Sequence, residues 1–468
     1  MKAPVAIGRY LPRPGAEPSR RHVLLDVGEE EIRIAGSSID GRGLLAMPAP
    51  VNAHDHGYGI RTLDFGCMDD ALETWVPWMR LRPPTDPYLE ALVAFGRVAK
   101  SGCGATMHCH NSLNAASLVE EAADVVRAAR DCGIRLALSC PLLDESPFVY
   151  GGLAELLPDL DEADRARIGQ LAPKYHPIPE QLAAVEEVAR NHAGGMVDVQ
   201  YGPIGPQWAS NALLEAIAEA SALTGRRVHM HLLESPRQRT WLDRRFPQGI
   251  VRYLDEIGFL SPRLAVAHGV QLRADECELL AERGVILVSN PSANLRLRSG
   301  IAPLGDVRRA ELKYALGLDG TGFDDDQDIW RELRLFSLLH GGRGLDPDIP
   351  AEEVFAAMHE GGCAVVNHPA RRDVVVVDYA ALTADAIFDD EDEAAVLLGR
   401  MTARHVKELH VAGQQIVGDG KLMTVDYDAA LRELVNQARS VRPMLEARRS
   451  DAEFLSQIVR RHYATRYS

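Results

Sequence analysis

The chain has 468 residues, of which 46% are hydrophobic and 25% are charged, proportions typical of a globular protein. This length is sufficient for a large α/β barrel together with a smaller module. The formal net charge of −16 argues against a nucleic-acid partner, because such partners require a basic protein surface.

The sequence also lacks the signals of membrane insertion and secretion. No apolar run approaches the length of a membrane span, and the first 21 residues contain no apolar core of a secretion signal. Seven scattered cysteines without a Cys-x-x-Cys spacing fit a reducing compartment and argue against a disulfide framework or a cysteine-type zinc site. We therefore expect a cytoplasmic enzyme.

The two ends of the chain share an alternating pattern that is typical of a half-buried sheet. This pattern covers residues 22–27 and 31–35 near the N-terminus, and it returns at 373–378 and 406–417. Because chain termini commonly lie close together, we expect a small β-sandwich module formed from both chain ends. The expected parts of this arrangement are residues 1–48 and 366–440 for the module, 49–365 for a central domain, and 441–468 for a helical tail.

The central domain alternates between apolar strand-like runs and helical patterns. Strands are expected around His54 and at 105–108, 134–139, 197–201, 228–232, 264–268, 285–289 and 314–318. Helices are expected at 86–100, 114–131, 179–192, 210–224, 273–283 and 327–340, with Asp86 and Ser210 as helix starts. Eight strands, each followed by a helix or a long loop, predict an α/β fold of the (β/α)8 TIM-barrel type.

A long acidic segment with several prolines, residues 141–177, follows the third of these strands. Loops of this length in compact domains are usually lids or binding loops. Surface decoration without a role in binding is the alternative.

Two histidines end the first strand of the predicted barrel, in the segment Asn52-Ala53-His54-Asp55-His56. Side chains at i and i+2 of a strand project from the same face, so His54 and His56 are expected to point at one spot. Two converging imidazoles are what a metal site needs from its first segment.

Catalytic groups of a parallel barrel lie at the C-terminal ends of its strands, so each candidate residue should end a strand. The residues that meet this condition are His54 and His56 on the first strand, His229, His231 and Glu234 at the fifth, His268 at the sixth and Asp319 at the eighth. Nitrogen and oxygen ligands of this kind hold a divalent ion and leave a position open for water. The pattern therefore predicts a hydrolytic metal centre.

These segments resemble the amidohydrolase superfamily, and within it the metal-dependent aminohydrolase and chlorohydrolase branch. That branch includes cytosine, guanine and adenosylhomocysteine-type deaminases and the triazine hydrolases. The resemblance is carried, in the family's order, by residues 52–56 (NAHDH), 229–235 (HMHLLES), 267–269 (AHG), 294–304 (NLRLRSGIAPL) and 318–320 (LDG). Residues 410–420 (HVAGQQIVGDG) resemble the strands that close the β-module.

The resemblance implies roles for six residues. One divalent metal ion, zinc or iron, would be bound by His54, His56, His231 and Asp319, and Asp319 would also accept a proton from the water that the ion activates. Glu234 would be the general acid and base. His268 would hydrogen-bond that water or the developing oxyanion.

Other residues near the strand ends are candidates for contact with a substrate. These are Trp75, His108, His110, Gln207, Trp208, His229 and Asn294. Trp208 could stack on a planar ring or pack within its loop, and His108 and His110 are open between substrate contact and packing. For His229, a role as a wall or hydrogen-bonding residue is favoured over that of a fifth metal ligand.

The leading functional hypothesis is deamination of an amino-substituted nitrogen heterocycle of the pyrimidine, purine, pterin or triazine type. Glu234 favours deamination over dehalogenation, because a leaving amine must be protonated and chloride need not be. Hydrolysis of a cyclic amide or amidine C–N bond, a chlorohydrolase and, more remotely, a catalytically silent binding protein are the alternatives.

Two further features bear on the centre and the assembly. The fourth strand, residues 196–201, contains no lysine, whereas dinuclear relatives bridge two metals through a modified lysine on this strand. One metal is therefore expected. The seventh strand ends in Ser289-Asn290-Pro291 instead of the histidine-cysteine-proline run of several relatives, a difference that concerns the substrate. As in many relatives, we expect a homo-oligomer, a dimer or higher.

Overall fold

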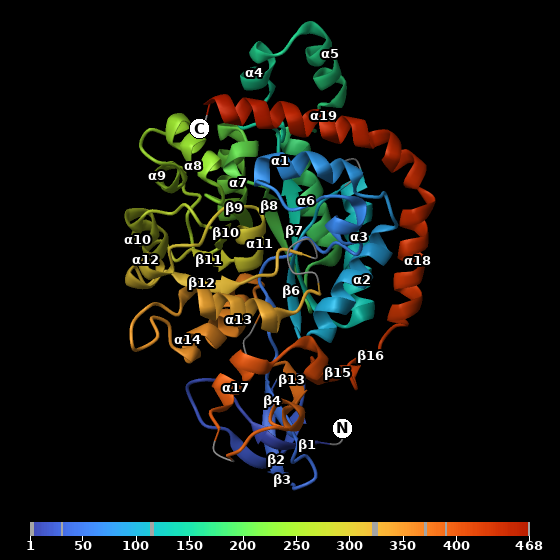
Figure 1. Cartoon of the computed structure of the whole chain (residues 1–468), viewed down its shortest axis with the longest axis vertical. Coiled ribbons are helices and arrows are strands. Elements are labelled where there is room, and N and C mark those ends of the chain that lie inside the picture. Colours follow the sequence, from blue (N-terminus) through green and yellow to red (C-terminus); the bar gives the residue numbers. More distant parts are fainter. Residues whose placement is uncertain are drawn as a thin grey trace.

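A computed structural model describes residues 4–29, 31–112, 117–320, 326–368, 372–388 and 391–466. Two eight-stranded sheets organise these residues, one forming a central barrel and the other lying at one end of the molecule (Figure 1). None of the helices in the described ranges combines the length and the apolar character that a membrane span requires.

The barrel is built from consecutive strands that all pair in parallel with their neighbours. Its strands are β5 (Val51–Asn52), β6 (Ala105–Cys109), β7 (Arg135–Leu142), β8 (Val197–Pro203), β9 (Val228–Leu232), β10 (Leu264–His268), β11 (Ile286–Ser289) and β12 (Lys313–Leu316). Backbone hydrogen bonds from Ala53 N to Leu316 O and from Leu318 N to His54 O, both 3.0 Å, join the last strand to the first. The predicted TIM-type barrel is thus confirmed.

The outer layer contains the predicted helices. They are α2 (Pro87–Lys100), α3 (Leu118–Cys132), α6 (Ile178–His192), α7 (Asn211–Thr224), α10 (Ala274–Glu282) and α13 (Ile329–His340). The predicted start of α3 at residue 114 lies outside the described residues. Asp86 accepts hydrogen bonds from two backbone N–H groups at the start of α2, and Ser210 accepts one from Leu213 N at the start of α7. Such caps satisfy N–H groups that have no partner within the helix.

Shorter helices lie between these elements. They are α1 (Leu72–Trp75), α8 (Pro236–Arg245), α9 (Ile250–Glu256), α11 (Pro291–Arg296), α12 (Leu304–Arg309), α14 (Ala351–Ala356) and α15 (Gly362–Val365), with the 3-10 turn η2 at Val76–Leu81. Cys363, Val365 and Val366 of the α15 segment pack in one buried cluster with inward side chains of the barrel strands such as Val51 and Ala315. The core therefore continues from the barrel interior onto α15.

The second sheet joins the two ends of the chain, as predicted for the β-module. Its order is β16 (Lys421–Leu422), β15 (Gln414–Gly418), β14 (Val406–Val411), β13 (Val374–Asp378), β4 (Leu44–Pro48), β1 (Val5–Tyr10), β2 (Arg20–Val27) and β3 (Ile32–Ser37). The seam between the two ends is the antiparallel pair β4–β13, in which Ala46 lies opposite Val376. The helices α16 (Tyr379–Leu382) and α17 (Glu393–Arg400) follow β13.

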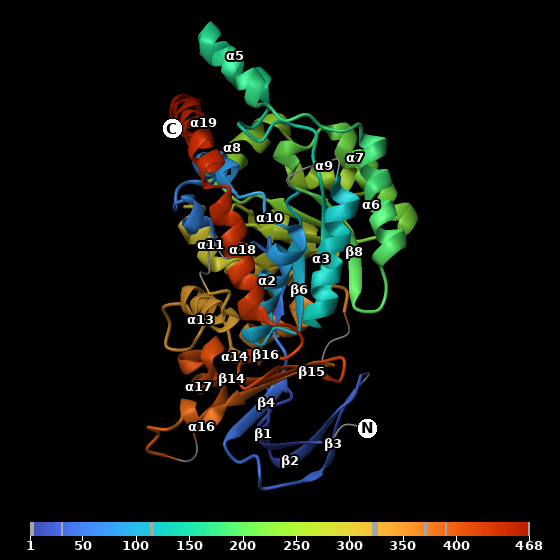
Figure 2. The same cartoon turned by 90° about the vertical axis from the view of Figure 1, so that its right-hand side faces the viewer.

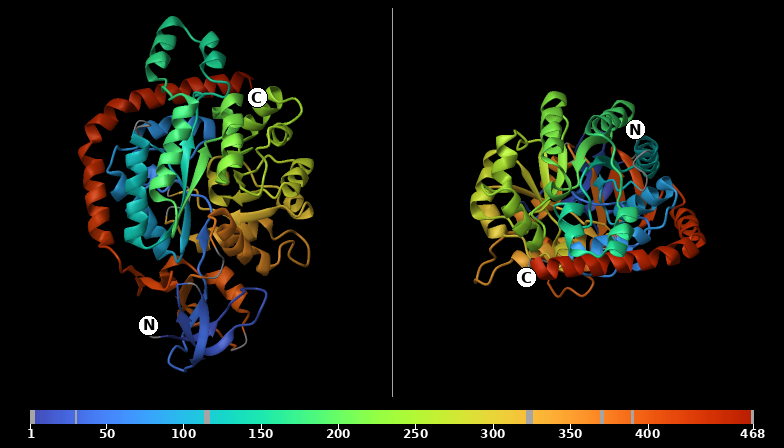
Figure 3. Two further views of the ribbon diagram at one scale, coloured as in Figure 1. Left: turned by 180° about the vertical axis from the view of Figure 1, so that it is seen from behind. Right: turned by 90° about the horizontal axis from the view of Figure 1, so that it is seen from above.

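The 141–177 insertion contains two helices, α4 (Leu153–Leu156) and α5 (Glu162–Leu171), which project from the end of the molecule opposite the second sheet (Figures 1 and 2). The C-terminal helices α18 (Tyr427–Ser440) and α19 (Arg442–Arg466) run along the outside of the barrel (Figure 3). Arg167 of α5 contacts Asp451 of α19 at 2.7 Å, and Tyr150 N donates a 3.0 Å hydrogen bond to the Tyr463 hydroxyl. The insertion is thereby attached to the last helix.

Candidate metal centre and active site

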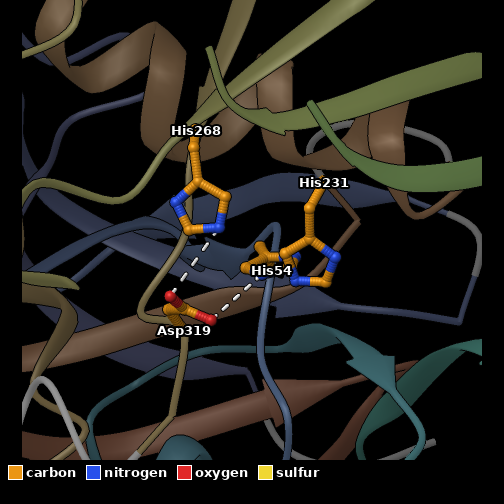
Figure 4. A group of neighbouring side chains, drawn as sticks. All are labelled: His54, His231, His268 and Asp319. Carbon is orange, nitrogen blue, oxygen red and sulfur yellow. Dashed lines mark ion pairs between the residues drawn. The ribbon is translucent and has the colours of Figure 1, made fainter. Parts of the chain in front are cut away.

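The strand ends bring the predicted metal-binding side chains together. Figure 4 shows His54, His231, His268 and Asp319 pointing toward one another, and their ligand atoms lie within 4.8 Å of each other. His56 joins this group, with its Nε2 3.2 Å from His231 Nε2. The group thus consists of the four metal ligands predicted from the sequence, together with His268.

The end of β12 explains how Asp319 enters this group. The strand stops at Leu316, two residues earlier than predicted, and the next residues turn so that Leu318 N and Asp319 N both donate to His54 O. Gly317 is required there, because an added Cβ would lie 2.7 Å from His54 Cβ and 2.5 Å from Asn290 Oδ1. Asp319 has a φ of 60°, a strained backbone conformation of the kind that clusters at functional sites.

Three of the distances between ligand atoms are those expected around a tetrahedral cation. His54 Nε2 lies 3.1 Å and His56 Nε2 lies 3.3 Å from Asp319 Oδ1, and the two nitrogens of His56 and His231 are 3.2 Å apart. Tetrahedral zinc bonds of about 2.0–2.1 Å place two ligand atoms roughly 3.3–3.4 Å apart. His54 Nε2 is also buried, and apart from its contact with Asp319 Oδ1 it has no hydrogen-bond partner in the described chain, as expected of a nitrogen reserved for a cation.

The charge states of His54, His231 and Asp319 suit a divalent ion. Burial lowers the pKa of His54 to about 3 and holds the pKa of His231 well below its ordinary value, so both imidazoles are neutral at pH 7. Burial alone would raise the pKa of Asp319, but the adjacent His54 and His56 hold it well below the ordinary range. Neutral histidines and an ionised carboxylate are the protonation states that metal ligation needs.

The outer ring nitrogens of the ligand histidines also have partners. Nδ1 of His56 lies 3.2 Å from the backbone oxygen of Cys109, and Nδ1 of His231 lies 2.6 Å from that of Ile204. A carbonyl oxygen can only accept, so each ring carries its proton on Nδ1 and presents the Nε2 lone pair to the centre.

Glu234 and His268 lie beside the ligands. The Glu234 side chain is buried, with Oε2 3.7 Å from His268 Nε2 and with Oε1 lacking a hydrogen-bond partner in the described residues. Burial raises the pKa of Glu234 to about 7. His268 Nδ1 lies 2.9 Å from Asn294 Oδ1, which leaves its Nε2 facing Glu234 and, at 3.9 Å, Asp319 Oδ2.

A cavity of about 590 Å³ opens onto these groups. Its lining includes Trp75 and Trp208, two of the predicted substrate contacts, and part of the insertion. Apolar walls come from α1, η2, the residue that follows α11 and the insertion, through Leu72, Val76, Met79, Leu297, Leu143 and Pro147. The volume is within the range of small-molecule sites.

The other predicted substrate contacts do not line this cavity among the described residues, and they have different partners. His108 packs edge-on against Phe95 of α2 at 5.5 Å, and His110 Nε2 lies 2.9 Å from Glu121 Oε2 of α3. Both therefore face the helix layer, because alternation along β6 turns the intervening Cys109 inward, with its sulfur 3.4 Å from His54 Nδ1. Gln207 accepts a hydrogen bond from Gln238; Asn294 contacts His268, and His229 contacts His54.

Sequence reasoning missed three residues that line the cavity beside His56. Asn111 Nδ2 lies 3.2 Å from His56 Nδ1, and Asn111 also contacts the Tyr58 hydroxyl. The Arg82 guanidinium lies over the Tyr58 ring at 5.1 Å and pairs with Glu90 at 2.9 Å. Asn111 lies two residues after the end of β6, and this position beyond a barrel strand was the available signal.

Comparison with known proteins gives a match to one family model and similarity to several deaminases. The amidohydrolase family model matches residues 45–381. A 5-methylthioadenosine/S-adenosylhomocysteine deaminase of Thermococcus sibiricus is 27% identical, over 75% of this chain and 78% of that protein. A 5'-deoxyadenosine deaminase of Methanosarcina mazei is 25% identical, over 89% of this chain and 91% of that protein.

Solved structures share the fold. An adenosine deaminase from Xanthomonas campestris with bound zinc superposes with a TM-score of 0.75 at 21% identity, covering 94% of this chain and 98% of that one. Atrazine chlorohydrolase from Arthrobacter aurescens, complexed with zinc, superposes with a TM-score of 0.76 at 20% identity, covering 92% and 99%. At these identities the likeness concerns the fold.

Proposed function

The chain belongs to the amidohydrolase family, and on this premise we propose that it is a metal-dependent aminohydrolase of amino-substituted nitrogen heterocycles. It is a hydrolase that acts on carbon–nitrogen bonds other than peptide bonds, as the deaminases among its relatives indicate. The substrate is a small molecule that fits the 590 Å³ cavity. Relatives named for deamination of adenosine-type compounds favour a purine-like ring.

One observation carries this proposal. A buried carboxylic acid whose pKa is near 7, Glu234, faces a cavity at whose end the histidines of the centre and the ionised Asp319 converge. An acid with a pKa near the working pH can both donate and accept a proton during turnover. Loss of ammonia requires such a group, because the amine must leave in its protonated form.

His54, His56, His231 and Asp319 would hold one divalent ion, with zinc preferred over iron. The fit rests on the ligand spacing of 3.1–3.3 Å and on the buried Nε2 of His54, whose polar contact is with another proposed ligand, Asp319. When bound, such an ion lowers the pKa of water toward ~7 and so makes a nucleophile available at neutral pH.

The remaining steps fall to the chain's own residues. Asp319 accepts a proton from the attacking water, and Glu234 donates a proton to the ring nitrogen next to the amidine-like carbon. That carbon becomes tetrahedral, and His268 Nε2 hydrogen-bonds the oxygen added to it. The ionised Glu234 then takes the proton of the added hydroxyl group and passes it to the amino group, the carbon–nitrogen bond breaks as the carbonyl forms, and ammonia leaves. The proton held by Asp319 returns to Glu234 and restores its protonated form.

The test is a panel of aminated heterocycles, with and without ring chlorine, incubated with the zinc-loaded protein. Release of ammonia without chloride is the expected result. A chlorohydrolase is the second candidate, favoured by the shared fold with atrazine chlorohydrolase, and it would release chloride instead. Ring opening without either product would point to a cyclic amide hydrolase.

A further inference from the structure

His54 differs from the other histidines of the centre in the partner of its outer nitrogen. His56, His231 and His268 each hold Nδ1 against an oxygen atom. His54 Nδ1 instead lies 2.8 Å from Nε2 of a second imidazole, His229. Carboxylates, carbonyl oxygens and water are the usual partners of metal-ligating histidines, so this pair calls for an explanation.

The two rings are held firmly in this contact. The two ring planes are inclined by 19° with 5.0 Å between their centroids, so the rings meet nearly edge to edge through these nitrogens, and both are fully buried, at 0% and 2% exposure. His229 lies on β9, two residues before His231. The same strand therefore supplies the proposed ligand His231 and the hydrogen-bond partner of the proposed ligand His54. The Cys109 sulfur is the other group near His54 Nδ1, at 3.4 Å, but a thiol is a weak acceptor.

The tautomer of His54 determines which ring donates. Binding of a cation at His54 Nε2 requires a lone pair on that nitrogen, so the proton must be on Nδ1. Nδ1–H then donates to His229 Nε2. The second nitrogen of His229, Nδ1, has no hydrogen-bond partner among the described residues. It would lack a partner whether or not it carried the proton, so it does not argue against His229 Nε2 as the acceptor.

We propose that His229 is a positioning residue that accepts the Nδ1–H of His54 and thereby directs the His54 Nε2 lone pair at the metal position. This inference rests on the proposed metal site. A direct role of His229 as a ligand fits less well, because 2.8 Å is a hydrogen-bond distance and is shorter than the roughly 3.3 Å between two ligands of one tetrahedral ion. His54, Cys109 and His229 could nevertheless form a second cation site, which the experiment must distinguish.

The test compares zinc affinity among full-length variants by competition with a chromogenic chelator, together with the zinc-to-chain ratio. His229→Phe keeps a ring but removes the acceptor, and loss of a residue that orients a ligand typically weakens metal binding about 10–100-fold. His229→Gln can place an amide oxygen near the original Nε2 and should stay within about threefold of the parent protein. Cys109→Ala is the matched control and should leave the affinity unchanged.

Folding is checked by the thermal unfolding midpoint of each metal-free variant. If His229→Phe does not fold, His229→Asn replaces it, because its shorter amide does not reach His54 and should lose affinity where His229→Gln keeps it. A parent protein that binds no zinc would overturn the metal site itself.

If the parent protein and His229→Phe bind zinc equally well, the positioning role is overturned and the metal site stands. Equal losses in the glutamine and phenylalanine variants would refute the hydrogen bond as the cause. Two zinc ions per parent chain, falling to one in both His229→Phe and Cys109→Ala, would assign His229 as a ligand and overturn the proposal.

Discussion

Replacing Glu234 with glutamine removes the proposed proton carrier and keeps the shape of its side chain. The carboxylate lies beside the centre, with Oε2 3.7 Å from His268 Nε2, and it is not one of the four proposed ligands. General acid–base catalysis contributes about 10²–10⁴-fold to rate, or about 2.7–5.5 kcal/mol at 1.36 kcal/mol per decade. We therefore expect kcat/KM for ammonia release to fall by about 10²–10⁴-fold, with the zinc content unchanged.

The assay couples ammonia release to a spectrophotometric readout on the best substrate of the panel, with elemental analysis of the same samples. Glu276, buried in a pair with Arg239 at 2.7 Å, provides a matched control, since Glu276→Gln alters a buried carboxylate remote from the cavity lining. An active Glu234→Gln protein that still holds zinc would refute the proton-transfer role. Loss of zinc together with activity would show that Glu234 belongs to the metal site instead.

The same substitution has a pH-dependent effect on the stability of the metal-free protein. Burial raises the pKa of Glu234 from 4.5 to about 7, so the folded state holds a proton that the unfolded chain releases between these two values. The stability of the parent relative to Glu234→Gln is therefore largest below pH 4.5 and declines until pH 7, by about 3 kcal/mol in total. Urea unfolding of both proteins at pH 4.5, 6 and 8 measures this difference; a constant difference would contradict the raised pKa.

Three further substitutions test other parts of the molecule. His231→Ala should lose most of the roughly one zinc per chain expected of the parent, measured by elemental analysis, and an unchanged content would refute the ligand assignment. Trp208→Ala should raise KM by about 2–10-fold through loss of ring stacking worth about 0.5–1.5 kcal/mol, and an unaltered KM would leave Trp208 as a packing residue. Arg135→Ala leaves the largely buried Asp373 carboxylate without its 2.7 Å partner between β7 and the second sheet, and it should destabilise the fold by about 3–5 kcal/mol. Urea unfolding checks this value against the exposed pair Arg283–Asp255, where Arg283→Ala should change little.

The sequence alone predicted the barrel, the module formed from both chain ends and the residues that meet at the centre. Strand and helix periodicities are local properties, and the end of each parallel strand is where functional groups gather. His54, His56, His231, His268 and Asp319 each follow from this rule, and the structure brings their ligand atoms within a few ångströms.

Tertiary structure alone decided which neighbours of these residues face the cavity. The sequence left His108 and His110 open between substrate contact and packing, and the pairing of β6 with β5 and β7 turns Cys109 inward and both histidines toward α2 and α3. A shift of one residue reverses every side chain of a strand, and alternation by itself does not state which set points inward. The contact between His229 and His54 joins residues 175 positions apart, and the insertion supplies walls of the cavity through packing that no local pattern specifies. Local periodicity thus determined the elements and their ends, whereas strand register and long-range packing determined the surroundings of the metal centre.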